Sequence, residues 1–309
     1  MTSAPDIDSL TAELHEALEL LADYAGSDGR TISPEPLPSL LDECKAICDG
    51  FAQPAPYRSI HHLACTGGTL ISKCIAALPN VVLLSEIDPI SPKELRQNFA
   101  TGFAPTDILL GLHRASHRVA PEVMIEVFKS AIATAQNALS MRGAILVLRD
   151  HAHGQFCTVV DHDKRPTLHD MLADCGPQRA VVTVRHPLES FAALFAKQGQ
   201  WHLFEPFDLG SYARRYLAFL DRHQGMPMIR YEDFVENPQG TLEEICHILD
   251  LPYSPLALDL IGAVQLSGDS GRSGSTIEQR PRRDIPPEID KDRAEADYVT
   301  LCSQLGYDP

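Results

Sequence analysis

Apolar residues follow two different patterns along the chain. From Tyr57 onward, several short apolar runs are nearly unbroken, which is typical of strands buried on both faces of a parallel sheet. We predict five such strands, at residues 57–64, 81–85, 144–150, 180–185 and 227–231. Between them the apolar residues recur at helical spacing, which predicts helices at 69–78, 121–141, 187–197, 210–222 and 240–250. Strands and helices in this order predict an α/β domain whose parallel sheet has helices on both faces.

The N-terminal part of the chain looks different. Leucines at helical spacing predict a helix over residues 9–24, and a second, shorter helix follows at 40–51. The stretches "GSDGRTISPEPLPS" and "AQPAPY", rich in proline, break the chain after each helix. This part is too short to bury a large core of its own. We therefore predict a helical extension over residues 1–55, followed by an α/β domain over residues 56–309.

The chain of 309 residues carries a net charge of −16. An acidic chain of this kind, with a pI of about 5.2, argues against a broad nucleic-acid-binding face. The eight cysteines include no Cys-x-x-Cys pair, so neither a zinc ribbon nor a thioredoxin-type site is indicated. No apolar run approaches the ~20 residues that span a bilayer, and the N-terminus lacks the basic-then-apolar profile of a signal peptide. We expect a soluble, cytoplasmic protein with no membrane and no nucleic-acid partner.

The stretch "ACTGGTL" (64–70) lies where the first predicted strand meets the first predicted helix. Its two glycines allow backbone N–H groups to point inward, and the helix N-terminus adds the positive end of its dipole. Thr66 and Thr69 add hydroxyl donors, so the turn is suited to an anion. The string G-x-x-x-x-G-K-[ST] of an ATP-type loop is missing, and Lys73 comes one helical turn later. The alternative is a strand-to-helix turn without a ligand.

Later arginines also favour an anionic ligand. Arg185 ends a predicted strand and Ser190 lies just inside the next helix, where both side chains can donate to a phosphate. Further on, the glycine–serine stretch "SGDSGRSGS" is centred on Arg272. In a chain with a net charge of −16, this concentration of arginine indicates an anion-binding pocket. The alternative for the glycine–serine stretch is a solvated surface loop.

In this order the motifs resemble those of the sulfotransferases that use 3′-phosphoadenosine 5′-phosphosulfate (PAPS), in particular bacterial-type members with a site spacing similar to tyrosylprotein sulfotransferases. The most specific match is "RYEDFVENPQGTLEEICHILDLP", residues 230–252, and the motifs together span residues 57–285. The resemblance implies a P-loop-type fold and PAPS as co-substrate, with no metal. It implies donor-binding residues at Cys65, Thr66, Gly67, Gly68, Thr69, Leu70, Arg185, Ser190, Arg272, Ser273 and Gly274.

Two positions depart from the family pattern. Cys65 stands where many members carry Lys or Arg just before the loop's Ser/Thr-Gly pair, so another cation must neutralise the leaving oxygen. Lys73 and Arg149 are the candidates for that role. Ala193 stands where the family serine usually lies, and Ser190, three residues earlier, takes a similar face of the helix.

Sulfuryl transfer needs a base, and Glu86, directly after a buried strand, is the first candidate. Tyrosylprotein sulfotransferases place a catalytic glutamate in a similar position, whereas the alternative is that Glu86 caps a turn. At the end of another strand, the Arg149-Asp150 pair resembles the Lys-Asp pair that tyrosylprotein sulfotransferases carry after the equivalent strand. The resemblance implies that Arg149 stabilises the transferring group and Asp150 orients it. His151 or His153 is the alternative base. Their His-x-His spacing lacks a clear third ligand, so we predict no metal site there.

These features predict an enzyme that transfers a sulfuryl group from PAPS to a hydroxyl or amine of a small-molecule or glycan acceptor. Two alternatives stay open: a P-loop kinase acting on a small molecule, and a catalytically inactive nucleotide-binding relative of the sulfotransferases. The sequence identifies neither the acceptor nor the oligomeric state, for which a homodimer is one option.

Overall fold

The computed structural model describes residues 54–91, 107–196, 204–267, 277 and 284–309, together with residues 15, 16, 18 and 19. Contacts divide the chain into two compact units, Met1–Gln53 and Pro54–Pro309. In the first unit the four described residues are helical and exposed. The rest of the predicted helix over 9–24, and the whole of the one at 40–51, fall outside the described residues.

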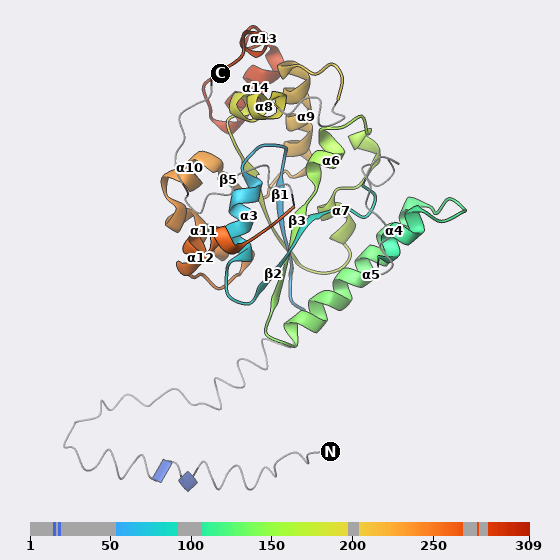
Figure 1. The fold of residues 1–309 in the computed structure, drawn as a ribbon, viewed down its shortest axis with the longest axis vertical. Coiled ribbons are helices and arrows are strands. Elements are labelled where there is room, and N and C mark those ends of the chain that lie inside the picture. The colour runs from blue at the N-terminus through green and yellow to red at the C-terminus, as the bar shows by residue number, and fades with distance from the viewer. Residues whose placement is uncertain are drawn as a thin grey trace, which may run out of the picture. The chain divides into compact units, whose positions relative to one another are not determined.

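The second unit is built on a five-stranded sheet (Figure 1). The strands are β1 (Tyr57–His62), β2 (Val81–Ile87), β3 (Ile145–Asp150), β4 (Gln178–Val184) and β5 (Met228–Arg230). They lie in the order β2-β3-β1-β4-β5, and every neighbouring pair is parallel. The predicted parallel α/β fold is confirmed, and each predicted strand is present with shifted ends. All five carboxyl ends therefore meet at one edge of the sheet, where ligands of such folds bind.

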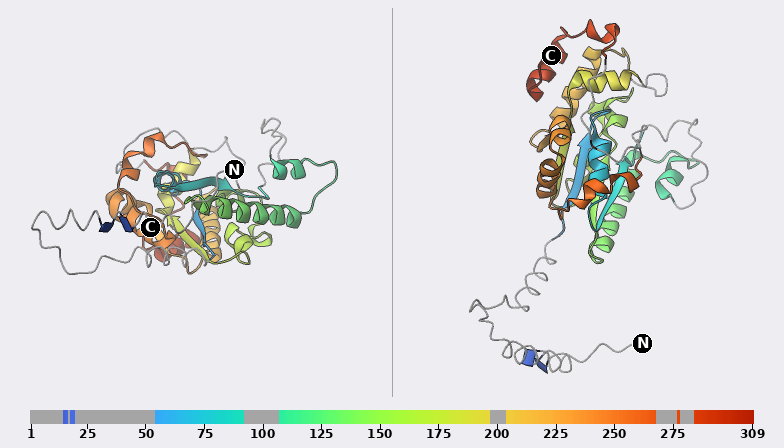
Figure 2. Two further views of the ribbon diagram at one scale, coloured as in Figure 1. Left: turned by 90° about the horizontal axis from the view of Figure 1, so that it is seen from below. Right: turned by 60° about the vertical axis from the view of Figure 1, so that its left-hand side comes forward.

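Helices cover both faces of this sheet (Figure 2). One face carries α3 (Gly68–Ala76), α10 (Tyr231–Glu236), α11 (Pro238–Leu249) and α12 (Leu256–Asp259). The other carries α5 (Pro121–Ser140), α6 (Ala152–Phe156), α7 (Leu168–Leu172), α8 (Pro187–Phe195), α9 (Leu209–Arg222) and α14 (Ala296–Leu305). Short elements complete the unit: α4 (Ile108–His113), η1 (His162–Lys164), η2 (Ile261–Ala263) and α13 (Pro287–Asp290). Among the described residues, no helix combines the length and the apolar character needed to cross a membrane.

Alternation along the strands divides the core into separate clusters on the two faces. In β3, Val147 packs in the cluster with α3 and α11, whereas Leu146 and Leu148 pack in the cluster with α5 and α7. The same alternation continues into the polar ends of β1 and β3. His62 and Arg149 share the α3 face, and His61 and Asp150 share the opposite face. Each face therefore has its own polar cluster at the edge of the sheet.

Two helices on which the site depends begin at well-formed caps. The Asp208 side chain accepts a hydrogen bond from the Ser211 amide at the start of α9. The Asn237 side chain does the same for Gly240 at the start of α11, with Pro238 in the first turn. An Asn cap followed by Pro satisfies amides that the first helical turn leaves unpaired. This explains the "NP" of the long motif as a helix start rather than as a ligand contact.

Candidate active site

The turn between β1 and α3 has the geometry of an anion-binding loop. Cys65 and Gly67 both have left-handed backbone conformations, with φ of 64° and 86°. Gly67 caps α3 without any side-chain hydrogen bond, and the first turn of α3 contains no acidic residue. The amides at the start of this nine-residue helix are therefore not capped by a side chain, and the positive end of the helix dipole would attract an anion there. The Thr66 hydroxyl is buried and donates to the Leu63 carbonyl at 2.9 Å, so it shapes the loop from within.

Both loop glycines are required by close neighbours. A Cβ added to Gly67 would come within 2.1 Å of the Tyr231 ring, and one added to Gly68 within 2.2 Å of the His62 ring. Such separations are impossible for real atoms, so any side chain at either position would displace the ring beside it. Tyr231, the "Y" of the RYED stretch, thus supports the loop from behind.

Arg149 lies at the centre of a buried hydrogen-bond network on the α3 face. Its Nε donates to His62 Nε2, and its Nη2 donates to Thr69 Oγ1, both at 2.8 Å. Its Nη1 donates to Ser85 Oγ and to the Ser267 carbonyl, also at 2.8 Å each. The side chain is only 1% exposed. Arg149, one of the two predicted substitutes for the missing loop cation, is thus held against the start of α3.

The imidazole of His62 is neutral and accepts the hydrogen bond that Arg149 donates. Burial, and then the charge of Arg149, hold the pKa of His62 well below its usual range, so the ring is neutral. Its Nδ1 lies 3.3 Å from the Leu63 carbonyl, so Nδ1 carries the proton and Nε2 accepts from Arg149. A protonated ring would instead place a second cation beside the guanidinium.

Glu86 lies where β2 leaves regular pairing with β3. The register shifts between Leu84 and Ile87, and Glu86 itself is left-handed, with φ of 56°. A non-glycine residue in this region costs about 1 kcal/mol or more, and such residues cluster at functional sites. Its Oε1 lies 3.4 Å from Arg149 Nη2, and its side chain is 14% exposed. The predicted base is therefore partly accessible and ion-paired to the predicted stabilising cation.

Arg185 reaches the same loop from the end of β4. Its Nη1 lies 3.5 Å from the Cys65 carbonyl, its Nη2 lies 3.4 Å from Glu189 Oε2, and its guanidinium stacks 4.9 Å from the centre of the Tyr231 ring. Ser190, in α8, is fully buried, so a ligand contact would require it to move. Arg272, Ser273 and Gly274 lie outside the described residues.

The predicted alternative base, His151, belongs to a neighbouring buried group. Its Nδ1 lies 3.9 Å from Asp88 Oδ2, and Asp88 is in turn paired with Arg165 at 2.5 Å. The rings of His151 and His153 meet edge to face, with centroids 4.1 Å apart. Both histidines are nearly fully buried. Among the described residues this pair is not part of a group of three potential metal ligands.

Sequence reasoning missed several residues of the Arg149 network. Ser85 directly precedes Glu86, and Ser267 opens the glycine–serine loop; their hydroxyls lie 2.8 Å apart. His62 was visible only as a polar residue on the strand before the loop. In the sequence, Ser85 could be noticed only because it precedes Glu86, and Ser267 only because it begins the glycine–serine stretch. Nothing in the spacing of the two serines along the chain indicates that both contact Arg149.

Glu232, the "E" of RYED, connects three segments near Arg185: its own helix α10, the segment that follows β4, and the C-terminal residues. Its Oε1 accepts from the His186 amide at 3.1 Å, and its Oε2 accepts from the Tyr307 hydroxyl at 2.7 Å. His186 Nε2 lies 3.1 Å from the Asp308 carbonyl. The long motif therefore positions the backbone that carries Arg185, through contacts with the last residues of the chain.

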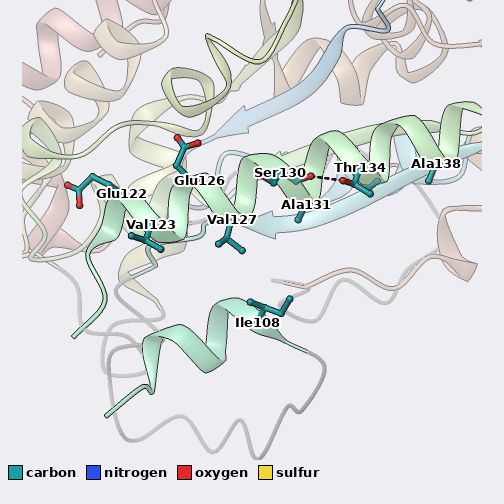
Figure 3. Close-up of a pocket in the computed structure, with 10 residues that line it drawn as sticks. Ile108, Glu122, Val123, Glu126, Val127, Ser130, Ala131, Thr134 and Ala138 are labelled. Carbon is teal, nitrogen blue, oxygen red and sulfur yellow. Dashed lines mark hydrogen bonds between the residues drawn. The ribbon is translucent and has the colours of Figure 1, made fainter. Parts of the chain in front are cut away.

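A separate groove of about 890 Å³ lies between α4 and α5. Figure 3 shows Ile108 of α4 directed towards α5, across from Val127. The lining is mostly apolar, with Glu122 and Glu126 towards one end. No residue of the loop or of the Arg149 network lines it, so the groove is distinct from the candidate active site.

Solved structures that are similar to this chain include two sulfotransferases. The sulfotransferase domain from the curacin biosynthetic pathway is 16% identical, with a TM-score of 0.49, over 82% of this chain and 98% of that domain. A sulfotransferase from Alicyclobacillus acidocaldarius is 13% identical, with a TM-score of 0.43, over 83% of this chain and 98% of that one. No curated protein sequence matches the chain. Residues 63–255, however, match the profile of the sulfotransferase family, from the loop to the end of the RYED motif. Because this match spans more than half of the 309 residues, the chain belongs to the sulfotransferase family.

Proposed function

We propose that this sulfotransferase takes its sulfuryl group from PAPS and transfers it to a hydroxyl or amine of a small-molecule or glycan acceptor. The observation that carries the proposal is the position of Arg149, whose Nη2 lies 2.8 Å from Thr69 Oγ1 and 3.4 Å from Glu86 Oε1. One buried cation thus joins the anion-binding helix start to a partly exposed carboxylate. An anion cradle beside a base is the pair of groups that sulfuryl transfer requires.

In the proposed reaction Glu86 accepts the proton of the acceptor O–H or N–H. The acceptor atom forms a bond to sulfur, and the bond between sulfur and the bridging oxygen breaks. The electron pair of that bond stays on the 5′-phosphate of the product, 3′-phosphoadenosine 5′-phosphate (PAP). Arg149 and the amides at the start of α3 stabilise this charge, because they are fixed before the reaction begins. The proposal assigns no step to a metal ion.

The donor's phosphates are proposed to bind on both sides of the loop. Cys65, Thr66, Gly67, Gly68, Thr69 and Leu70 would hold the 5′-phosphosulfate through backbone amides and the Thr69 hydroxyl. Arg185 is proposed to bind the 3′-phosphate, since it stands beside the loop on the neighbouring strand. The contributions of Arg272, Ser273 and Gly274 stay predictions.

Calorimetry with PAP, in buffer without metal ions, tests the donor. We expect the wild-type chain to bind PAP, and Arg185→Ala to weaken binding by about 2 kcal/mol or more, about 30-fold in Kd. Arg179→Ala is the matched control, because Arg179 lies at the exposed start of the same strand β4. Failure of the wild type to bind PAP, or equal binding of ATP with Mg²⁺, would contradict the proposal and favour a kinase or an inactive relative.

Turnover with radiolabelled PAPS tests the base. Glu86→Gln keeps the shape of the side chain but cannot accept a proton, so we expect a fall in kcat of about 10²-fold or more, within the range for a general base. PAP binding should change little. If Glu86→Gln retains kcat while His151→Asn loses it, the base is His151 instead.

A further inference from the structure

A second polar cluster lies on the sheet face opposite Arg149. His61 Nδ1 is 2.8 Å from Asp150 Oδ2, and His61 Nε2 is 2.9 Å from Ser59 Oγ. The ring of His223, at the end of α9, packs 4.6 Å from the ring of His61, centroid to centroid. A ring nitrogen of each histidine and an oxygen of Asp150 all lie within 4.8 Å of one another. These residues come from β1, β3 and α9, and all are buried.

One nitrogen in this cluster has no hydrogen-bond partner. His223 Nδ1 lies 2.7 Å from the Phe219 carbonyl, so Nδ1 carries the proton and Nε2 keeps its lone pair. His223 Nε2 is fully buried and makes no hydrogen bond, although the residue is only 3% exposed. A buried polar atom without a partner costs free energy and calls for an explanation. An imidazole whose other nitrogen donates to a carbonyl is oriented in the way that metal-binding histidines are.

His61 can adopt the same kind of tautomer, in which one ring nitrogen donates a hydrogen bond and the other keeps its lone pair. Without a cation, His61 Nδ1 and Asp150 Oδ2 share a proton in a hydrogen bond; with the proton on Nε2 and donated to Ser59 Oγ, the Nδ1 lone pair and Asp150 Oδ2 would both point at a cation placed between them. Neutral His61 and His223 bring no positive charge to the buried Asp150 carboxylate, and Arg165, whose charge acts on it, is paired with Asp88. A divalent cation in the cluster would add a compensating charge. Two imidazole nitrogens and one carboxylate oxygen form a ligand set that suits Zn²⁺.

We propose that His61 Nδ1, Asp150 Oδ2 and His223 Nε2 bind one Zn²⁺ ion, with a water molecule as the fourth ligand. Ligands at about 2.0 Å in tetrahedral geometry stand about 3.3 Å apart, so the first two atoms separate by about half an ångström on binding. His169 stands beside this cluster, its ring 6.2 Å from that of His61, and its Nδ1 is also buried and unpaired. That nitrogen is available to accept a hydrogen bond from the bound water.

This ion would be structural rather than catalytic. His61 precedes His62 in β1, and Asp150 follows Arg149 in β3. On the sheet face opposite Arg149, the ion would link the ends of β1 and β3 to the end of α9. This link would hold the backbone of His62 and Arg149, whose side chains are hydrogen-bonded to each other. The inference rests on these contacts alone and is independent of the identity of the sulfuryl donor.

The test uses the full chain, purified without a histidine tag and stripped of metal with a chelator. Titration with Zn²⁺, followed by desalting and elemental analysis, should give one ion per chain. Titration with Co²⁺ should give the visible absorption of a four-coordinate site. Zn²⁺ should also raise the thermal midpoint of unfolding, because only the folded chain brings the three ligands together and so binds the ion more tightly than the unfolded chain does.

His223→Ala and Asp150→Asn each remove one ligand. Both should weaken Zn²⁺ binding by more than about 100-fold, since changes around the ligands alone cost about 10- to 100-fold. Both should also abolish the shift in the unfolding midpoint. His247→Ala is the control, because His247 is an exposed histidine at the end of α11 and its loss should leave binding unchanged.

Absence of stoichiometric Zn²⁺ binding by the wild-type chain would overturn the proposal, whatever the variants do. Stoichiometric binding that both His223→Ala and Asp150→Asn retain would overturn it equally. Circular dichroism checks that both variants fold. If one variant does not fold, the Zn²⁺ affinity of the other variant, which lacks a different ligand, tests the proposal.

Discussion

Arg149 and Glu86 form an ion pair across neighbouring strands, with Nη2 and Oε1 3.4 Å apart, at the carboxyl edge of the sheet. The guanidinium also donates hydrogen bonds of 2.8 Å to groups from β1, β2, α3 and the start of the glycine–serine loop. A single side chain therefore connects Glu86, the proposed base, with the proposed anion loop and the segment that follows α12. The predictions below follow from this network and from the contacts that support it.

Arg149→Lys should inactivate the enzyme although it keeps the positive charge. An ammonium group cannot reproduce the planar fork that reaches His62, Thr69 and Ser267 together. We expect kcat to fall by about 10²-fold or more, and the free energy of unfolding to fall by about 1–3 kcal/mol as buried acceptors lose their partner. Turnover assays and urea unfolding measure the two effects. Arg142→Lys, at an exposed arginine that bonds the Ala138 carbonyl, should change neither.

Gly67→Ala and Gly68→Ala should each destabilise the chain by about 1–3 kcal/mol, because the new methyl group overlaps Tyr231 or His62. Both should weaken PAP binding, since the displaced rings support the loop. Gly111→Ala is the control: it adds a methyl group to helix α4 where no atom lies within 4 Å, so stability should hold or rise by up to about 1 kcal/mol. Equal effects of all three substitutions would show that close packing is not what selects glycine in the loop.

Cys65 should be the thiol that the donor site protects. Burial raises the pKa of Cys74 and of Cys157 to about 12, so both thiols stay protonated and unreactive in the folded chain near pH 8. Cys65 is only half-buried and sits in the loop. We expect PAP to slow its alkylation by iodoacetamide, measured by peptide mass mapping. Cys175, half-buried and outside the loop, should alkylate at one rate with or without PAP; protection of Cys175 as well would contradict a local effect.

Tyr307→Phe should loosen the support behind Arg185. The change removes the hydroxyl that donates to Glu232 Oε2 and leaves that oxygen without this partner, at a cost of about 1–3 kcal/mol in unfolding free energy. Because Glu232 also holds the amide of His186, PAP binding should weaken together with stability. Tyr253→Phe removes a buried hydroxyl that has no hydrogen-bond partner, so its stability should stay the same or rise. A loss of equal size in both variants would refute the role of the Glu232 contact.

The sequence by itself determined the order of the elements and the edge of the sheet at which the chemistry lies. Unbroken apolar runs such as "ILVL" in β3 indicate a strand covered on both faces, and hence a parallel sheet between two layers of helices. The run "VVLLS", predicted as another buried strand, is instead the edge strand β2, whose residues are only partly buried or exposed. In such a sheet the residues after each strand, among them Glu86 and Arg185, must gather at one edge. Glycines between a strand and a helix likewise predicted an anion loop at Gly67 and Gly68, because that conclusion depends on local backbone geometry alone.

The tertiary structure decided which of these residues meet. Strand order placed β3 between β1 and β2, and so brought Arg149 against His62 and Glu86, residues separated from it by more than 60 positions. Alternation along β1 sent His62 to the α3 face and His61 to the opposite one, so adjacent histidines joined different clusters. Ser267 and His223 reached those clusters through the packing of distant segments. Local patterns carry no record of such contacts, because only the packed core fixes which strand ends become neighbours.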